Sequence, residues 1–398
     1  MKKHSTIPAQ PVPTTRATAG QSQMTRVFEL CVCKARSNIK RLADQPKSGA
    51  FAVNGDYFTC KEEFFDIGNW TSSFFTGMAL LAWRQTKDEY FIHQVNRLAP
   101  WYRKKVFERH MDTMHDLGFL YSLYSVALYK LTGDPDHRRV GLRAAELLAE
   151  RFDRKGGYIR AWGRMDDRES DYAGLAIIDC MMNLPLLYWA SRETGDQRWS
   201  NVAIWHANTT LQYLIRADDS VFHSYRFDPK SGEVAGGDNY CGRSAESHWA
   251  RGTAWAIYGF ALSYREVGDR RYLDAALRLA RRFLQNLDDE VVPIWDFKLP
   301  AGENPLRDSS AAAIAVCGLQ ELLKHEPGET VLATGKETVL SRICTEDYLD
   351  FSESCPGVLK NAEVGDGVGK ARRAYTSWGD YFCMEALNTE LQLGETFW

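Results

Sequence analysis

Two aspartates could take part in acid–base chemistry, and one of them, Asp179, lies in an apolar run, where an ionised carboxylate is costly. Asp116 is part of the segment MHDLGF, and Asp179 is part of the segment IIDCMMNLP. A buried carboxylate is stable only when it is paired, hydrogen-bonded or protonated. Two such groups could carry out general acid–base catalysis. Structural alternatives remain open: Asp116 could be a helix N-cap, and Asp179 could bind backbone N–H groups or an arginine.

A second set of residues could bind an anionic or sugar-like ligand. Arg251 and Trp255 are four residues apart in WARGTAW and therefore share one helix face. An inward arginine needs an anion, either an aspartate of another element or a substrate carboxylate. His223 closes the segment ADDSVFH, where a lone histidine is most often structural. Three tryptophans fall where loops meet expected helices and could wall a sugar site: Trp70, Trp162 and Trp378.

Hydrophobic periodicity predicts a chain that is mostly helical. The expected helices span 24–42, 70–85, 88–107, 117–131, 136–152, 180–193, 197–215, 248–265, 270–286, 309–324, 332–350 and 376–392. Strands are expected only around 157–162, 221–227 and 291–297.

The joints between these helices repeat. Gly133, Gly195 and Gly268 are each followed by Asp, which suits a left-handed helix end and the N-cap of the next helix. Each joint follows an apolar helix and precedes an amphipathic one, and Lys87-Asp88 is a weaker copy. Six such hairpins predict an all-α (α/α)6 toroid, since the repeat of about 34 residues of a tetratricopeptide solenoid is absent.

Five long connections are expected to gather on one rim of the toroid and to carry the site. They span 43–69, 153–179, 216–247, 287–308 and 351–375. Residues 1–23 are polar and proline-containing, without the apolar core of a signal peptide, so we expect a disordered tail. Residues 24–398 are expected to form a single catalytic domain.

Composition excludes several classes of function. The 398 residues carry 49 Lys and Arg against 52 Asp and Glu, a net charge of −3, which argues against a nucleic-acid surface. No apolar run approaches the length of about 18 residues that a membrane span needs. The 9 cysteines lack repeated metal-ligand or disulfide spacing. We therefore expect a cytoplasmic monomer or weak homodimer that needs no metal or organic cofactor.

Seven sequence blocks together resemble glycoside hydrolase family 88, the unsaturated glucuronyl hydrolases. In order from about residue 66 to 390 they are GNWTSSFFTGM, HDLGFLY, IIDCMMNLPLLYWAS, ADDSVFH, WARGTAWAIYG, RDSSAAAIA and SWGDYF. Family 105, the unsaturated rhamnogalacturonyl hydrolases, shares the toroid and the paired aspartates but is less similar in these blocks.

The resemblance implies a specific reaction on oligosaccharides that polysaccharide lyases produce. The 4,5-unsaturated glucuronic acid at the non-reducing end is hydrated at its C4=C5 enol ether and leaves as a 4-deoxy keto-uronate. Asp179 matches the family's general acid/base, and Asp116 matches the aspartate that holds ring hydroxyls and tunes its partner. The substrate-binding set that we expect is Trp70, Phe74, His115, Trp162, His223, Arg251, Trp255 and Trp378.

The chemistry suits these residue types. An acid that protonates an alkene carbon must keep its proton near neutral pH, which apolar surroundings and the neighbouring Asp116 anion would favour for Asp179. The rival functions are an unsaturated rhamnogalacturonyl hydrolase and a non-catalytic toroid that binds oligosaccharide. The intact pair of aspartates favours an enzyme.

Two departures from the family pattern concern substrate preference. Cys241 stands where many members have a glutamine, and Arg243 could substitute for it. The segment GDGVGKARRAY lacks the histidine that many relatives show, although Lys370, Arg372 and Arg373 could meet an anionic substituent.

Overall fold

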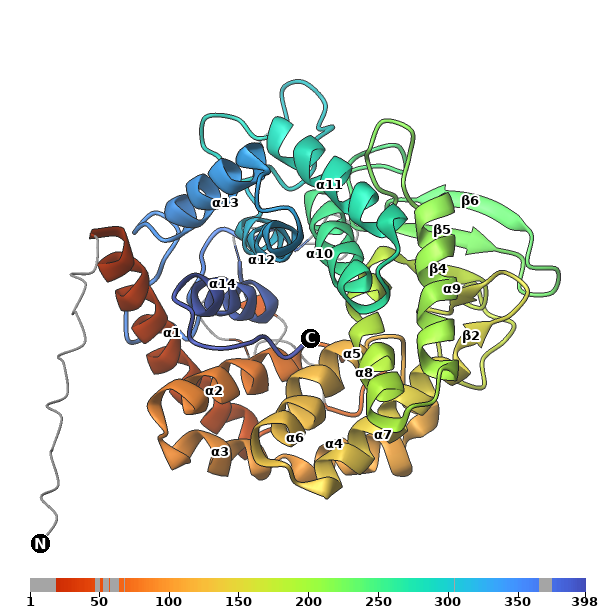
Figure 1. Ribbon diagram of the computed structural model, residues 1–398, viewed down its shortest axis with the longest axis horizontal. Helices are drawn as coiled ribbons and strands as arrows, with labels where there is room; N and C mark the ends of the chain where they lie inside the picture. The colour runs from red at the N-terminus through yellow and green to blue at the C-terminus, as the bar shows by residue number, and fades with distance from the viewer. Residues whose placement is uncertain are drawn as a thin grey trace, which may run out of the picture.

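Apolar and amphipathic helices alternate along the chain and form an inner and an outer ring (Figure 1). The computed structural model describes residues 19–46, 51–52, 57, 64–67, 69–303, 305–364 and 374–398. The expected tail lies outside the described residues up to residue 18, and helix α1 already begins at Ala19.

The inner ring consists of helices that are buried around almost their whole circumference. They are α2 (Ser72–Thr86), α5 (Leu117–Tyr121) continued by a π-helical turn (Ser122–Val126) and α6 (Ala127–Thr132), α8 (Leu184–Thr194) preceded by a 3₁₀ turn (Ile178–Met182), α10 (Ala250–Val267), α12 (Ser309–His325) and α14 (Ser377–Glu390). The expected alternation is confirmed, because each inner helix follows an outer one and runs back through the ring (Figure 1).

The outer ring consists of amphipathic helices that bury one face and expose the other. They are α1 (Ala19–Asp44), α3 (Glu89–Asn96) with α4 (Ala99–Phe107), α7 (Pro135–Glu150), α9 (Arg198–Tyr213), α11 (Arg270–Gln285) and α13 (Thr330–Ile343). The helix expected over 88–107 is interrupted before Pro100, because proline lacks an N–H group and restricts the residue before it.

The joints have the conformations that their sequence predicts. Gly133, Gly195 and Gly268 end their helices with φ of 74°, 73° and 70°. Lys87 takes the same left-handed conformation at the fourth joint, with φ of 57°, although a side chain disfavours it. The aspartate after each joint accepts a hydrogen bond from a backbone N–H two residues later, as Asp269 does from Arg271.

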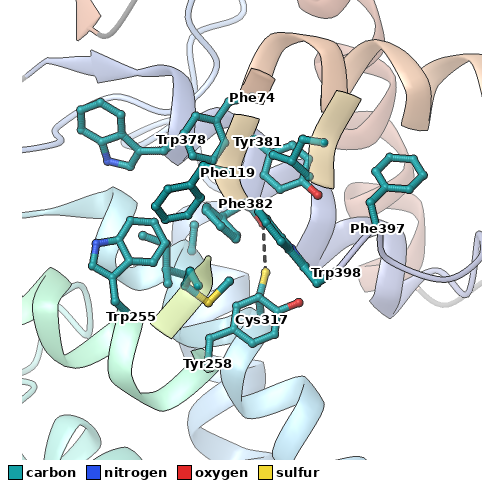
Figure 2. Close-up of a cluster of buried hydrophobic side chains, with 14 of the residues drawn as sticks. Phe74, Phe119, Trp255, Tyr258, Cys317, Trp378, Tyr381, Phe382, Phe397 and Trp398 are labelled. Atoms are coloured by element: carbon teal, nitrogen blue, oxygen red, sulfur yellow. Dashed lines mark hydrogen bonds between the residues drawn. The ribbon is translucent and has the colours of Figure 1, made fainter. Parts of the chain in front are cut away.

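The ring closes between the two ends of the described chain. Helix α14 packs against α12 on one side and against α2 and α1 on the other. Strand β1 (Phe51–Ala52) pairs with β7 (Tyr375–Thr376), and Asn38 Nδ2 donates to the carbonyl of Pro356 at 2.9 Å. The last residues turn into the ring, where Trp398 stacks on Phe382 (Figure 2).

The long connections carry short strands that pair with strands of neighbouring segments. A three-stranded antiparallel sheet joins β4 (Leu175–Ile177), β5 (Ser224–Phe227) and β6 (Val234–Asp238), and β2 (Phe152–Asp153) pairs with β3 (Tyr158–Ile159). The strand expected over 291–297 is wrong: Pro293 lies within it, and only single bridges form, such as Trp249 to Asp296. In the described part of the chain, no helix has the length and apolarity to cross a membrane.

Lys87→Gly should stabilise the protein by roughly 0.5–1 kcal/mol, because glycine adopts the left-handed conformation of this joint without a steric cost. The midpoint of urea unfolding measures the effect. The matched control is Gly268→Ala, which places a side chain in the same conformation at a sister joint and should lower the midpoint. An unchanged or lower midpoint for Lys87→Gly would contradict this account of the joints.

Candidate active site

The turn that carries Asp116 buries its carboxylate without using it as a cap. Asp116 occupies the N-cap position of α5 and is 6% exposed, yet its side chain accepts no capping hydrogen bond. The neighbouring side chain is that of His115, whose Nε2 lies 3.5 Å from Asp116 Oδ1. Burial lowers the pKa of His115 to about 3, so this imidazole is neutral at physiological pH. The N-cap interpretation therefore applies to the backbone of Asp116 and not to its carboxylate.

Asp179 lies in the 3₁₀ turn before α8, and its carboxylate also lacks a structural partner. Within the described residues its Oδ2 atom is buried and accepts no hydrogen bond, and no arginine pairs with it. His223 Nε2 lies 3.5 Å from that atom. The interpretation of Asp179 as a structural carboxylate required backbone or arginine partners, and this geometry does not support it.

Close packing of the two turns brings the carboxylates together. A Cβ atom on Gly118 would lie 2.3 Å from Asn183 Cα, so this contact requires glycine. Asn183 Oδ1 accepts the N–H of Phe119 at 2.7 Å, and Asn183 Nδ2 donates to the carbonyl of Asp179 at 3.2 Å. Asn183 thus bridges the helix that follows Asp116 and the turn that contains Asp179.

The two acids share one electrostatic environment. Burial, together with the negative charge of Asp179, raises the pKa of Asp116 to about 8. Asp116 therefore retains its proton at neutral pH, as an acid catalyst requires.

The three-stranded sheet positions His223 against Asp179. Strands β4 and β5 pair next to both residues, and the N–H of Ile178 donates to the carbonyl of His223 at 2.9 Å. The N–H of Cys241 donates to His223 Nδ1 at 3.3 Å, which assigns the ring proton to Nε2, facing Asp179. Burial disfavours a positive charge on His223, whereas Cys241 and Asp179 favour it, and the net effect raises its pKa.

A buried cation that the sequence did not reveal holds the neighbouring loop. Arg151 follows α7, is fully buried, and within the described residues has no carboxylate partner. Its guanidinium donates to the carbonyls of Thr113 at 2.7 Å and Trp162 at 2.9 Å. Three more carbonyls accept from it, those of Arg160, Ala161 and Gly163. Arg151 therefore ties the loop of Trp162 to the segment that leads into Asp116.

Arg251 has the structural partner that we left open as an alternative. Its guanidinium is 3% exposed and pairs with Asp308, at the start of the next inner helix. It also donates to the carbonyls of Glu363 and Val364, each at 2.7 Å, and lies over the ring of Trp378. These contacts favour a structural role over direct binding of a substrate carboxylate, and sequence reasoning missed the partner because it lies 57 residues away.

The expected sugar-facing aromatics divide into two groups. Phe74 and Trp255 are fully buried among the inner helices (Figure 2), so their geometry favours packing under the site. Trp378 is also buried and donates from Nε1 to Ser310 at 3.0 Å. Trp70 and Trp162 remain half-buried, Trp70 stacked on Trp378 and Trp162 next to His223.

The two departures from the family pattern have different outcomes. Arg243 is engaged elsewhere, with Glu303, so the expectation that it replaces the glutamine is not supported. Cys241 contributes its backbone N–H to His223. Lys370, Arg372 and Arg373 lie outside the described residues.

Sequence reasoning also missed residues that the fold brings to the site. Trp249 lies 4.8 Å from His223 between ring centroids, and its indole N–H has no acceptor among the described residues. Tyr172 and Tyr240 flank Trp162. Trp249 was part of a quoted motif, whereas the two tyrosines lie on loops with no periodic signal.

Enzymes that act on sugars commonly place paired carboxyl groups beside aromatic rings. Because this toroid combines both features, we assign the protein to the class of carbohydrate-active toroids. More narrowly, the chain belongs to glycoside hydrolase family 88, because residues 54–348 match the family described as Glycosyl Hydrolase Family 88.

Known proteins that resemble the chain agree with this assignment. The unsaturated glucuronyl hydrolase of Bacillus sp. (strain GL1) is 35% identical over 339 residues, 84% of this chain and 89% of that protein. The unsaturated chondroitin disaccharide hydrolase of Streptococcus pyogenes serotype M1 is 36% identical over 358 residues, 84% of this chain and 87% of that protein. The crystal structure of unsaturated glucuronyl hydrolase from Streptococcus agalactiae superposes with a TM-score of 0.86 at 29% identity, covering 98% of this chain and 100% of that one.

Asp116→Asn should remove activity without lowering stability at alkaline pH. A folded-state pKa raised from 3.8 to about 8 means that the stability contribution of Asp116 is full below the unfolded value and is lost as the pH rises through 8. The amide cannot ionise, so the Tm at pH 9 should equal or exceed that of wild type, while kcat falls at least ~100-fold. Calorimetry at pH 5, 7 and 9 and initial rates measure both effects. A lower Tm at every pH with normal kcat would instead support an N-cap role.

Arg251→Met should cost about 3–5 kcal/mol of stability, because it leaves the buried Asp308 carboxylate without its partner. The double variant with Asp308→Asn should recover part of this loss, since asparagine retains the cap at the start of α12. Urea unfolding of both variants measures the cycle. A single variant with the wild-type urea midpoint and a reduced kcat/KM would show that Arg251 binds substrate instead.

Proposed function

We propose that the protein removes 4,5-unsaturated glucuronic acid from the non-reducing end of lyase-generated oligosaccharides. Membership of glycoside hydrolase family 88 supports this activity, as do relatives named unsaturated glucuronyl hydrolase and unsaturated chondroitin disaccharide hydrolase. The observation that carries the proposal is the pair of neighbouring carboxyl groups: Asp179 Oδ2 accepts no hydrogen bond from the described residues, and the raised pKa of Asp116 keeps a proton on that carboxyl at neutral pH.

In the proposed reaction, Asp179 acts on the C4=C5 double bond. Its proton passes to C4, and a water molecule adds its oxygen to C5 while its released proton returns to the carboxyl pair. The C5 hemiketal then opens by breaking the bond from C5 to the ring oxygen. The hemiacetal left at C1 releases the remaining oligosaccharide as an alcohol, and the unsaturated sugar departs as a 4-deoxy keto-uronate.

Each neighbouring residue has a proposed part in this reaction. Asp116 holds a ring hydroxyl, and His223 orients the Asp179 carboxylate through its Nε2 atom. The buried indole N–H of Trp249 has no acceptor among the described residues and suits an oxygen atom of the bound sugar. His115 Nδ1 is likewise buried and unpartnered and supports the expected contact with substrate.

The alternatives receive less support. The family match and the named relatives favour the glucuronyl hydrolase over the rhamnogalacturonyl hydrolase. A toroid that only binds oligosaccharide would gain nothing from two buried acids whose charges repel, because uncompensated buried charge destabilises a fold. We also propose a cytoplasmic location, which eight unpaired cysteines among the described residues support, and a monomer or weak homodimer.

Asp179→Asn should keep the fold and lose nearly all turnover, at least ~100-fold in kcat, because the amide cannot deliver a proton to C4. Loss of the alkene absorbance of an unsaturated disaccharide measures the reaction. Asp274→Asn, at an exposed position of α11, is the matched control and should behave as wild type. Turnover by Asp179→Asn within a few-fold of wild type would exclude this residue as the acid.

A further inference from the structure

Arg151 is a buried cation without a part in the reaction proposed above. It follows α7 and is fully buried, and within the part of the chain that the structure describes it forms no ion pair. Its guanidinium instead donates to five backbone carbonyls and to the sulfur atom of Met165 at 3.2 Å. Burying an unpaired charge is costly, and neutral donors could bind carbonyls equally well. The retained charge therefore needs an explanation beyond these hydrogen bonds.

Ala161 is the residue through which Arg151 contacts both acid-bearing segments. The carbonyl of Ala161 accepts from Arg151 Nη2 at 3.1 Å and from the N–H of His115 at 3.0 Å. The N–H of Ala161 donates to the carbonyl of Leu175, the first residue of β4, at 2.8 Å. His115 directly precedes one acid of the pair, and β4 ends two residues before the other. The peptide groups of Ala161 thus join the two segments, and Arg151 holds them.

Further bonds of the same guanidinium fix its orientation. Arg151 Nη1 donates to the carbonyl of Thr113, three residues before Asp116, at 2.7 Å. Arg151 Nε donates to the carbonyl of Arg160 at 2.7 Å, and the N–H of Arg160 donates back to the carbonyl of Arg151 at 3.0 Å. The planar guanidinium therefore holds the segment before Asp116 in one position relative to residues 160–163.

The charges around the carboxyl pair come from several elements of the ring. Burial and the negative charge of Asp179 raise the pKa of Asp116 to about 8, and the positive charges of Arg151 and Lys105 oppose this rise. Lys105 lies on α4 and is 2% exposed. Arg151 has the larger effect of the two cations. Other titratable groups that act on Arg151 or on His115 are His206, His223, Arg160, Arg168 and Cys180.

We propose that Arg151 is a positioning residue for this reaction: it fixes both acid-bearing segments through Ala161, and its charge stabilises the anion that forms when the carboxyl pair gives a proton to C4 of the sugar. The inference rests on the proposed function and adds to it a residue that acts through the two acids. A fixed charge in a buried site is effective because it needs no reorganisation during the reaction.

Two variants remove this charge. Arg151→Gln keeps an amide that can donate to a carbonyl, whereas Arg151→Met keeps no donor. The acid then ionises at higher pH, so the alkaline limb of kcat/KM on an unsaturated disaccharide should move up by about 0.5–1 pH unit. At the optimum, kcat should fall at least ~10-fold, because the anion loses its stabilising charge. Circular dichroism at each pH gives the folded fraction by which the rates are divided.

Arg160→Met is the matched control. Arg160 is 1% exposed, forms no ion pair with other described residues, and donates to the carbonyls of Arg164 at 2.7 Å and Met165 at 3.1 Å. Its charge has a weaker effect on Asp116 than that of Arg151. The control variant should therefore lower the midpoint of urea unfolding and leave the alkaline limb at the wild-type pH.

The outcomes separate this inference from the proposed function. A wild-type alkaline limb in the folded Arg151 variants would overturn the role of the charge. An equal shift in Arg160→Met would overturn it too, since loss of loop contacts alone would then move the limb. Failure of both Arg151 variants to fold would assign this residue to the fold alone and overturn the proposal. Absence of turnover by the wild-type protein would instead overturn the proposed function itself.

Discussion

The contact between Gly118 and Asn183 is the constraint on which the rest of the site depends. It allows the helix after Asp116 and the turn around Asp179 to approach more closely than any side chain at 118 would permit. The approach forces two acids into one buried environment, where their repulsion and desolvation retain a proton. The cost is offset by the surrounding apolar core, which includes the buried rings of Phe119, Trp255 and Phe382 (Figure 2).

Two buried arginines have different roles in this ring. Arg251 pairs with Asp308 and so joins two neighbouring inner helices. Arg151 binds only carbonyl oxygens and one sulfur atom among the described residues, so its charge remains available to the field around Asp116. One arginine therefore joins two inner helices, and the other links the loop of Trp162 to the segment that leads into Asp116.

Much of the fold followed from local patterns. All twelve expected helices are present. Each helix is predicted by its own hydrophobic periodicity and by the residues at its ends, such as Gly195, which ends one helix, and Asp196, which caps the next. The short strands β4 and β6 were missed, since three to five residues carry too little pattern and pair only after the ring has formed. In the candidate site, Asp179 stood out as a polar residue in an apolar run, whereas His223 was expected only through the family resemblance.

The sequence by itself determined the helical hairpins, the order of the ring and the two acids, since these depend on residue types and spacings within a single segment. Only the tertiary structure decided what those residues touch. It placed the raised pKa on Asp116, gave Arg251 its distant partner Asp308, and assembled Trp162, Tyr172 and Tyr240 from separate loops. Desolvation and pairing depend on neighbours from several hairpins, and those neighbours meet only when the ring closes.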